Sequence, residues 1–184
     1  HIKEHMPEAF DFDIPSVCAI APGVLGVTGV ETMDIVFGVA NKVKPDLIIA
    51  VDALASRRAA RISTTIQLSD SGISPGSGVG NTRADLSRAN LGVPVIAVGV
   101  PLVVYASTIS QDTISLIADE TGLHGDEKRL RELAEQVIAK HMGDFIVTPK
   151  DIDVIVEDMA GIIANAINSA LFGNNLEQVR NMLA

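Results

Sequence analysis

The sequence predicts an α/β fold in which a mostly parallel sheet is flanked by helices in three layers. Two continuous apolar runs, residues 47–51 and 93–100, are typical of buried parallel strands. Helical patterns precede the first run and follow the second, as expected for strand–helix–strand units. Aromatic residues make up only 3% of the chain and tryptophan is absent, so the core must consist of Val, Ile, Leu and Ala. That composition suits parallel strands covered by helices.

The N-terminal half supplies its own boundary signals. Residues 1–16 are predicted to form an irregular lead-in, and residues 17–21 a short buried strand. Thr28 and Glu31 match a capping box, which predicts a helix after Thr28 that ends near Lys42 to Pro45. Residues 62–69 alternate apolar and polar side chains, the pattern of a half-exposed strand near a sheet edge.

Residues 102–184 are predicted to be mainly helical. Pro101 is expected to end the second buried strand, and a helix over 106–120 to close before Gly122. A second helix carries an apolar stripe from Leu130 to Ile138 and stops at Gly143. Thr148 is the expected N-cap of the longest helix, which ends at Gly173. The whole chain, 1–184, is interpreted as a single α/β domain.

Bulk properties exclude several classes of protein. The net charge of −9 argues against direct nucleic-acid binding, and a single cysteine excludes an intrachain disulfide. No apolar run is expected to reach the length of a membrane span, so no membrane partner is expected and a cytoplasmic protein is the default. The chain begins at His1 without an initiator methionine, which indicates a piece of a longer protein.

Asp52 is the main candidate for chemistry. It directly follows the first apolar run, and ligands of open parallel sheets bind in the crevice at the carboxyl ends of the strands. The glycine-rich polar loop 69–81 comes soon after it. A carboxylate facing such a loop indicates a hydrolytic or ligand-binding site, although by spacing alone a capping role is the better explanation of Asp52.

The loop and its neighbours carry weaker signals. Residues 72–76 match the pattern G-x-S-x-G, but Pro75 lacks the amide that a nucleophile elbow needs after its serine. The glycines fit no phosphate-binding spacing, and a mobile surface loop is an equal alternative. Arg57, Arg58 and Arg61 are either a solvated face or a counter-charge for a carboxylate. The four histidines lie far from Asp52 in sequence, so no metal site and no cofactor are expected.

Several long segments closely resemble the germination protease family of spore-forming bacteria. They cover most of the chain between residues 17 and 171, and comprise residues 21–32, 45–57, 69–81, 91–101, 147–150 and 157–160. The resemblance implies an atypical aspartic endopeptidase that degrades small acid-soluble spore proteins during germination. It also implies an inactive precursor (a zymogen), a homotetramer, a location in the forespore or spore core, and a fold similar to that of hydrogenase maturation proteases.

The resemblance also assigns roles to residues. One of the two catalytic aspartates of the family matches Asp52, and the other lies upstream of His1, so this chain alone is expected to be inactive. The substrate cleft or loop is expected to comprise Arg57, Asp70, Ser71, Gly72, Gly76, Ser77, Gly78, Gly80 and Asn81. Two carboxylates would then activate a water molecule, one as base and the other as acid.

The chain departs from the family pattern at one place. Family members usually read Pro-Thr-Val-Val-Asp-Ala after the fourth strand, whereas Leu102 and Tyr105 replace a hydroxyl and an acid here. If those groups shape the cleft, specificity is altered. Two alternatives stay open: a metal-dependent, maturation-type peptidase with Asp52 as a ligand, and a non-catalytic oligomerisation module that uses the helical C-terminal region.

Overall fold

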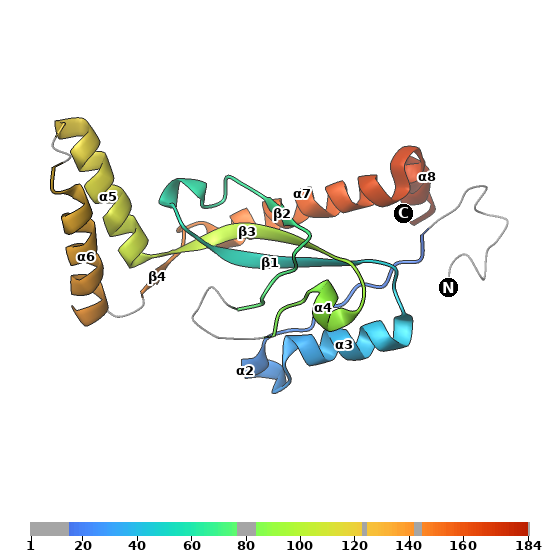
Figure 1. The fold of residues 1–184 in the computed structure, drawn as a ribbon. Helices are drawn as coiled ribbons and strands as arrows, with labels where there is room; N and C mark the ends of the chain where they lie inside the picture. The colour runs from blue at the N-terminus through green and yellow to red at the C-terminus, as the bar shows by residue number, and fades with distance from the viewer. Residues whose placement is uncertain (1–14, 77–83, 123–124, 142–144, 184) are drawn as a thin grey trace. The chain divides into compact units, whose positions relative to one another are not determined.

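The structure is a computed structural model, and it describes residues 15–76, 84–122, 125–141 and 145–183 (Figure 1). The chain divides into two compact units, one of residues 22–152 and the other of residues 1–21 with 153–184. The first holds the sheet and most of the helices. The second holds the long C-terminal helix. Whether the chain is a single domain stays a prediction.

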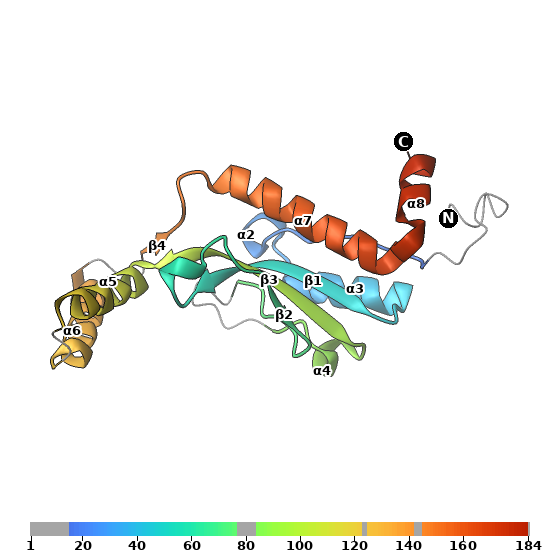
Figure 2. The same ribbon diagram turned by 90° about the horizontal axis from the view of Figure 1, so that it is seen from above.

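A mixed sheet of four strands forms the centre of the larger unit (Figures 1 and 2). Strands β1 (Ile48–Ser56) and β3 (Val95–Tyr105) pair in parallel. Strands β2 (Gln67–Ser69) and β4 (Ile146–Val147) both pair antiparallel with β3. Because Val104 pairs with Ser56 of β1 and with Val147 of β4, β4 must lie on the edge of β3 away from β1. The α/β class is confirmed, but the sheet is mixed rather than mostly parallel.

Both central strands are longer than the apolar runs that predicted them. β1 continues through Asp52 to Ser56, and β3 continues through Pro101 to Tyr105. Proline lacks an amide for a ladder, but β2 pairs with β3 only as far as Gly99, and the Pro101 carbonyl instead accepts the Ser63 amide (2.8 Å). Pro101 is therefore buried inside the strand rather than ending it.

The register of the two parallel strands shifts once. Leu54 pairs with Pro101 and Ala55 pairs with Val103, so Leu102 is an extra residue on β3. Bulges of this kind re-aim side chains and are common beside active sites. The Leu102 carbonyl accepts a hydrogen bond from the hydroxyl of Thr148 (3.1 Å). Thr148 therefore binds the sheet and does not cap the C-terminal helix, which starts later, at Ile152.

One face of the sheet is covered by helix α3 (Thr32–Val43) and the short helix α4 (Arg88–Leu91) (Figure 1). The core on this face is formed by Leu86, Leu91 and Val95 with partly buried residues packed against them: Met33, Val36, Ile48, Ala50, Ile73 and Val93. The capping box is wrong. Thr28 ends the preceding helix α2 (Leu25–Thr28), and its hydroxyl accepts the Val30 amide (3.2 Å), while Glu31 occupies the N-cap position of α3 without a side-chain cap.

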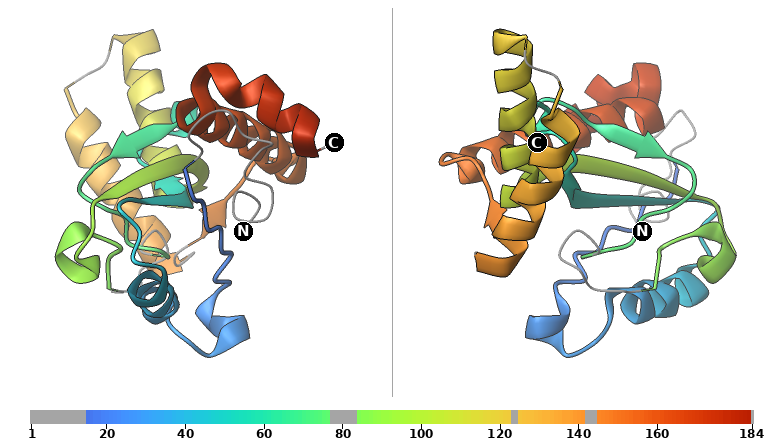
Figure 3. Two further views of the ribbon diagram at one scale, coloured as in Figure 1. Left: turned by 90° about the vertical axis from the view of Figure 1, so that its right-hand side faces the viewer. Right: turned by 60° about the vertical axis from the view of Figure 1, so that its left-hand side comes forward.

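Helices α5 (Ala106–Thr121) and α6 (Glu127–His141) form a hairpin beyond the carboxyl end of β3 (Figures 2 and 3). The predicted helix over 106–120 is confirmed, and Gly122 caps it in a left-handed conformation. The apolar stripe of α6 is only partly covered. Ile138 is buried, but Leu130, Leu133 and Val137 are each about half exposed, with exposed fractions of 49%, 53% and 48%.

The smaller unit consists mainly of α7 (Ile152–Phe172), a 3-10 turn at Gly173–Asn175 and α8 (Leu176–Leu183). Arg180 of α8 donates a hydrogen bond to Asn165 of α7 (2.7 Å). Residues 17–21 have no regular structure, so the strand predicted there is wrong. The prediction that no run reaches the length of a membrane span is also wrong, because residues 152–181 are long and apolar enough by length and composition. Core helices of soluble proteins pass the same test.

Candidate active site

Asp52 lies in the middle of β1, paired in register with Gly99 of β3. The sequence placed it at the end of a buried strand, and that placement is wrong by four residues, since β1 runs on to Ser56. Side chains alternate between the two faces of a strand, so Asp52 points to the same face as Ile48 and Ala50, which pack against the core. Its carboxylate is therefore half-buried next to the core.

Two backbone amides donate to the Asp52 carboxylate. Its Oδ1 accepts the Ala53 amide (2.8 Å), and the carboxylate also accepts the Gly76 amide. Partial burial raises the pKa of Asp52 above its usual value because it removes water from the charged form, and the two amides oppose that rise. A carboxyl group whose pKa is raised holds its proton to a higher pH, which suits an acid or base in catalysis.

The glycine-rich loop approaches Asp52 because backbone hydrogen bonds join the two ends of the loop. Ile73 and Leu86 exchange two backbone hydrogen bonds (3.1 and 2.7 Å). Gly72, with φ of 92°, lies so close to this pair that an added Cβ would stand 2.9 Å from the Ser87 Cα. The turn that follows brings the Gly76 amide to the carboxylate. The predicted loop residues Ser77, Gly78, Gly80 and Asn81 lie outside the described residues.

A cavity of about 580 Å³ opens at the carboxyl ends of β1 and β3. Asp52 is not one of its lining residues, but Ala53 and Gly76, whose amides donate to the Asp52 carboxylate, are. Its walls come from the end of β1, from the loop and from the start of α5. The lining residues are Ala53, Leu54, Ala55, Ser56, Arg57, Ser74, Gly76, Tyr105, Thr108 and Gln111. The structure thus brings the predicted residues Arg57 and Gly76 to one cavity next to Asp52. Asp70, Ser71 and Gly72 do not line it, although Gly72 forms the base of the loop.

The sequence reasoning missed the wall formed by α5. The sequence marks Tyr105, the last residue of β3, only as a departure from the family pattern and predicts no role for Thr108 and Gln111 on α5. The three residues follow at intervals of three, the spacing that places side chains on one face of a helix. That spacing at the start of a helix after a buried strand is the signal that could have identified them.

The turn after β1 is held by side chains. The buried hydroxyl of Ser56 donates to the Arg58 carbonyl (2.6 Å) and accepts the Arg58 amide (3.2 Å). The Asp112 carboxylate on α5 accepts the Ala59 amide (2.8 Å), which fixes this turn against the helix. Arg57 is exposed and lines the cavity. It is not among the causes of the raised Asp52 pKa, which are burial and two amides.

Potential metal ligands do not gather at this site or elsewhere in the part of the chain that the structure describes. Among those residues, no group of three or more His, Cys, Asp or Glu side chains is placed to hold a metal ion. The chemical groups that line the cavity are instead the hydroxyls of Ser74, Tyr105 and Thr108 and the Arg57 guanidinium. The Asp52 carboxyl accepts the amide of one lining residue, Gly76. A partly desolvated carboxyl next to the wall of an open cavity is compatible with a hydrolytic enzyme.

Comparison with known sequences agrees with that class. The sequence profile of the family described as "Germination protease" matches residues 1–129 and 120–182. The chain is 46% identical to the germination protease of Clostridium tetani over 93% of its length, and 46% identical to that of Caldanaerobacter subterraneus over 100%. It is 40% identical to that of Priestia megaterium over 93%. The chain belongs to the germination protease family.

The match covers only part of each relative. The chain spans 57% of the Clostridium tetani protein, 60% of the Caldanaerobacter subterraneus protein and 58% of the Priestia megaterium protein. Functional groups of the whole protein can therefore lie outside the residues described above.

Proposed function

We propose that this chain forms part of an endopeptidase that degrades small acid-soluble spore proteins during germination, with Asp52 as one of two catalytic carboxylates. The observation that carries the proposal is the Asp52 carboxyl itself. It is half-buried, has a raised pKa and accepts the amide of Gly76, which lines a cavity of about 580 Å³. The family of the chain and the names of its relatives support a peptidase.

In the proposed reaction, a water molecule lies between Asp52 and a second carboxyl group contributed from outside this chain. The ionised member of the pair takes a proton from the water as its oxygen attacks the peptide carbonyl carbon. The protonated member gives its proton to the peptide nitrogen as the C–N bond breaks. Two nearby carboxyl groups share one proton because both cannot ionise easily, and the raised pKa of Asp52 suits the acid role.

The remaining features of the proposal concern the whole protein. A single Asp52 cannot act as both base and acid, so this chain without its upstream partner is proposed to be inactive. The intact enzyme is proposed to be made as an inactive precursor, to assemble as a homotetramer and to act in the spore core. Its fold is proposed to be of the hydrogenase maturation protease type.

The test uses the full-length protein, including the residues that precede His1. Purified enzyme is incubated with a small acid-soluble spore protein, and the products are identified by mass spectrometry. Internal cleavage that is lost in Asp52→Asn, with assembly unchanged by size-exclusion chromatography, supports the proposal. Undiminished cleavage by Asp52→Asn would remove Asp52 from the mechanism. A parallel incubation with chelator shows whether a divalent ion is required.

A further inference from the structure

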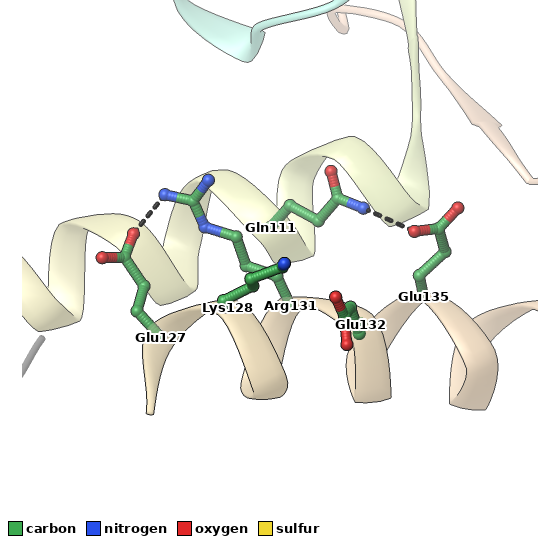
Figure 4. A pocket seen from close by; sticks show the side chains of 6 residues that line it. All are labelled: Gln111, Glu127, Lys128, Arg131, Glu132 and Glu135. Atoms are coloured by element: carbon green, nitrogen blue, oxygen red, sulfur yellow. Dashed lines mark hydrogen bonds and ion pairs between the residues drawn. The ribbon is translucent and has the colours of Figure 1, made fainter. Parts of the chain in front are cut away.

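A second cavity lies between helices α5 and α6, with a volume of about 420 Å³. Gln111 contributes from α5, and five charged side chains contribute from α6: Glu127, Lys128, Arg131, Glu132 and Glu135 (Figure 4). Both helices belong to the same compact unit as the sheet that carries Asp52. It forms a polar groove along the hairpin, called the hairpin groove below.

The hairpin groove shares one lining residue with the cavity near Asp52. Gln111 lines both of them. Its side-chain amide donates to Glu135 on α6 (3.1 Å), so the residue is held at the junction between the two (Figure 4). A polypeptide bound in that cavity extends beyond it, and at Gln111 the adjoining surface is the hairpin groove on α5 and α6.

The charges in the hairpin groove are only partly satisfied within it. Glu127 pairs with Arg131, and Glu135 accepts the Gln111 hydrogen bond. Lys128 and Glu132 are exposed, and neither makes an ion pair or hydrogen bond with another described residue. Three glutamates face one lysine and one arginine, so the lining is slightly acidic. The side chains of Lys128 and Glu132 are therefore available to interact with a bound polypeptide.

The dimensions suit a short extended segment. From Glu127 to Glu135, helix α6 rises by roughly 12 Å at 1.5 Å per residue. An extended chain advances about 3.3 Å per residue, so the groove accommodates three or four residues.

We infer that the hairpin groove is a secondary binding site for the protein substrate, which holds a polar segment outside the cleavage site and places a basic side chain of that segment against Glu132. The inference rests on the proposed function. The groove adds to the binding of an intact protein but not to that of a peptide that fills only the cavity beside Asp52.

The test compares two substrates of the full-length enzyme. One is an intact small acid-soluble spore protein, and the other is a short peptide that spans only its cleavage site. Glu132→Gln should raise KM for the intact protein about two- to fivefold, the range expected from one exposed charge pair, and Glu132→Lys should raise it further. Neither change should alter kcat or KM for the peptide. Glu120→Gln is the matched control, since Glu120 is exposed on α5 and lines neither cavity.

The outcomes separate the inference from the function on which it rests. Equal effects on protein and peptide, or no effect on either, would overturn the hairpin groove as a substrate site while leaving the peptidase intact. A change of assembly state in Glu132→Lys would also overturn it, because the groove would then be a contact between copies of the chain. A wild-type enzyme that cleaves neither substrate overturns the proposed function, and this inference with it.

Discussion

Replacing Gly99 with alanine should disturb the site through Leu54. Gly99 pairs with Asp52, and its lack of a side chain leaves the space that Leu54 occupies. An added Cβ would stand 2.8 Å from the Leu54 Cγ, which forces a shift, and 3.3 Å from its Cδ2, which is a tight contact. Leu54 lines the cavity near Asp52, so its side chain has open space on that side into which it can move.

The size of the effect follows from this geometry. An extra methyl group in a packed region costs about 1–3 kcal/mol. Because Leu54 is only half-buried and borders open space, Gly99→Ala should cost about 1–2 kcal/mol, the lower part of that range. The displaced leucine should also narrow the cavity and raise KM for a peptide substrate.

A double-mutant cycle isolates the contact. Urea unfolding of the full-length protein is measured for the wild type, Gly99→Ala, Leu54→Ala and the double variant. With Leu54 shortened, the added methyl group has room, so Gly99→Ala should then cost less than about 0.5 kcal/mol. An equal loss in both backgrounds would refute the claim that Gly99 is required by Leu54.

Three further predictions concern the loop, the carboxylate and the turn after β1. Gly72→Ala should lower the free energy of unfolding by about 2–4 kcal/mol, because the new side chain clashes with Ser87 and the backbone φ of 92° is strained for alanine. The control is Gly38→Ala, which lies in open space on α3 and should raise the free energy of unfolding by about 0.5–1 kcal/mol in the same assay. Folding raises the pKa of Asp52, so the native protein binds more protons than the unfolded chain between the usual aspartate pKa and the raised one, and stability falls as pH rises through that window. Asp52→Asn should therefore melt at a higher temperature than the wild type at neutral pH, with the difference shrinking below the usual aspartate range; a difference that does not change with pH would contradict the raised pKa. Asp112→Ala leaves the Ala59 amide without its acceptor and should cost about 1–3 kcal/mol, whereas Asp112→Asn, which keeps an acceptor oxygen, should retain most of that stability in thermal melts.

The parts of the fold with local signals could be predicted from the sequence. The helix over residues 106–120 has a clear stop at Gly122, and the apolar runs located the two central strands. The ends of those strands could not be found in this way. Ser56 pairs with Val104 only because the register shift leaves Leu102 of β3 without a partner on β1. Pro101 is tolerated because the pairing of β3 with β2 does not extend beyond Gly99. Both depend on which segments become neighbours.

The candidate site shows the same division. The resemblance to germination proteases, rather than spacing alone, predicts Asp52, Arg57 and Gly76 as site residues. The structure places Arg57 and Gly76 at one cavity, with the Gly76 amide donating to Asp52. Tyr105, Thr108 and Gln111 join them from a distant part of the sequence. Their place at the cavity depends on the parallel pairing of β1 with β3, which delivers the start of α5 to the end of β1.

The central claim is that the Asp52 carboxyl takes part in peptide-bond hydrolysis. Its most direct test is the single-turnover cleavage rate of full-length Asp52→Asn, compared with Asp46→Asn, which alters an exposed aspartate just before β1. Proton transfer by one positioned group contributes about 10²–10⁴-fold, so Asp52→Asn should slow cleavage at least about a hundredfold while Asp46→Asn cleaves normally. Equal rates for the two variants would contradict the account.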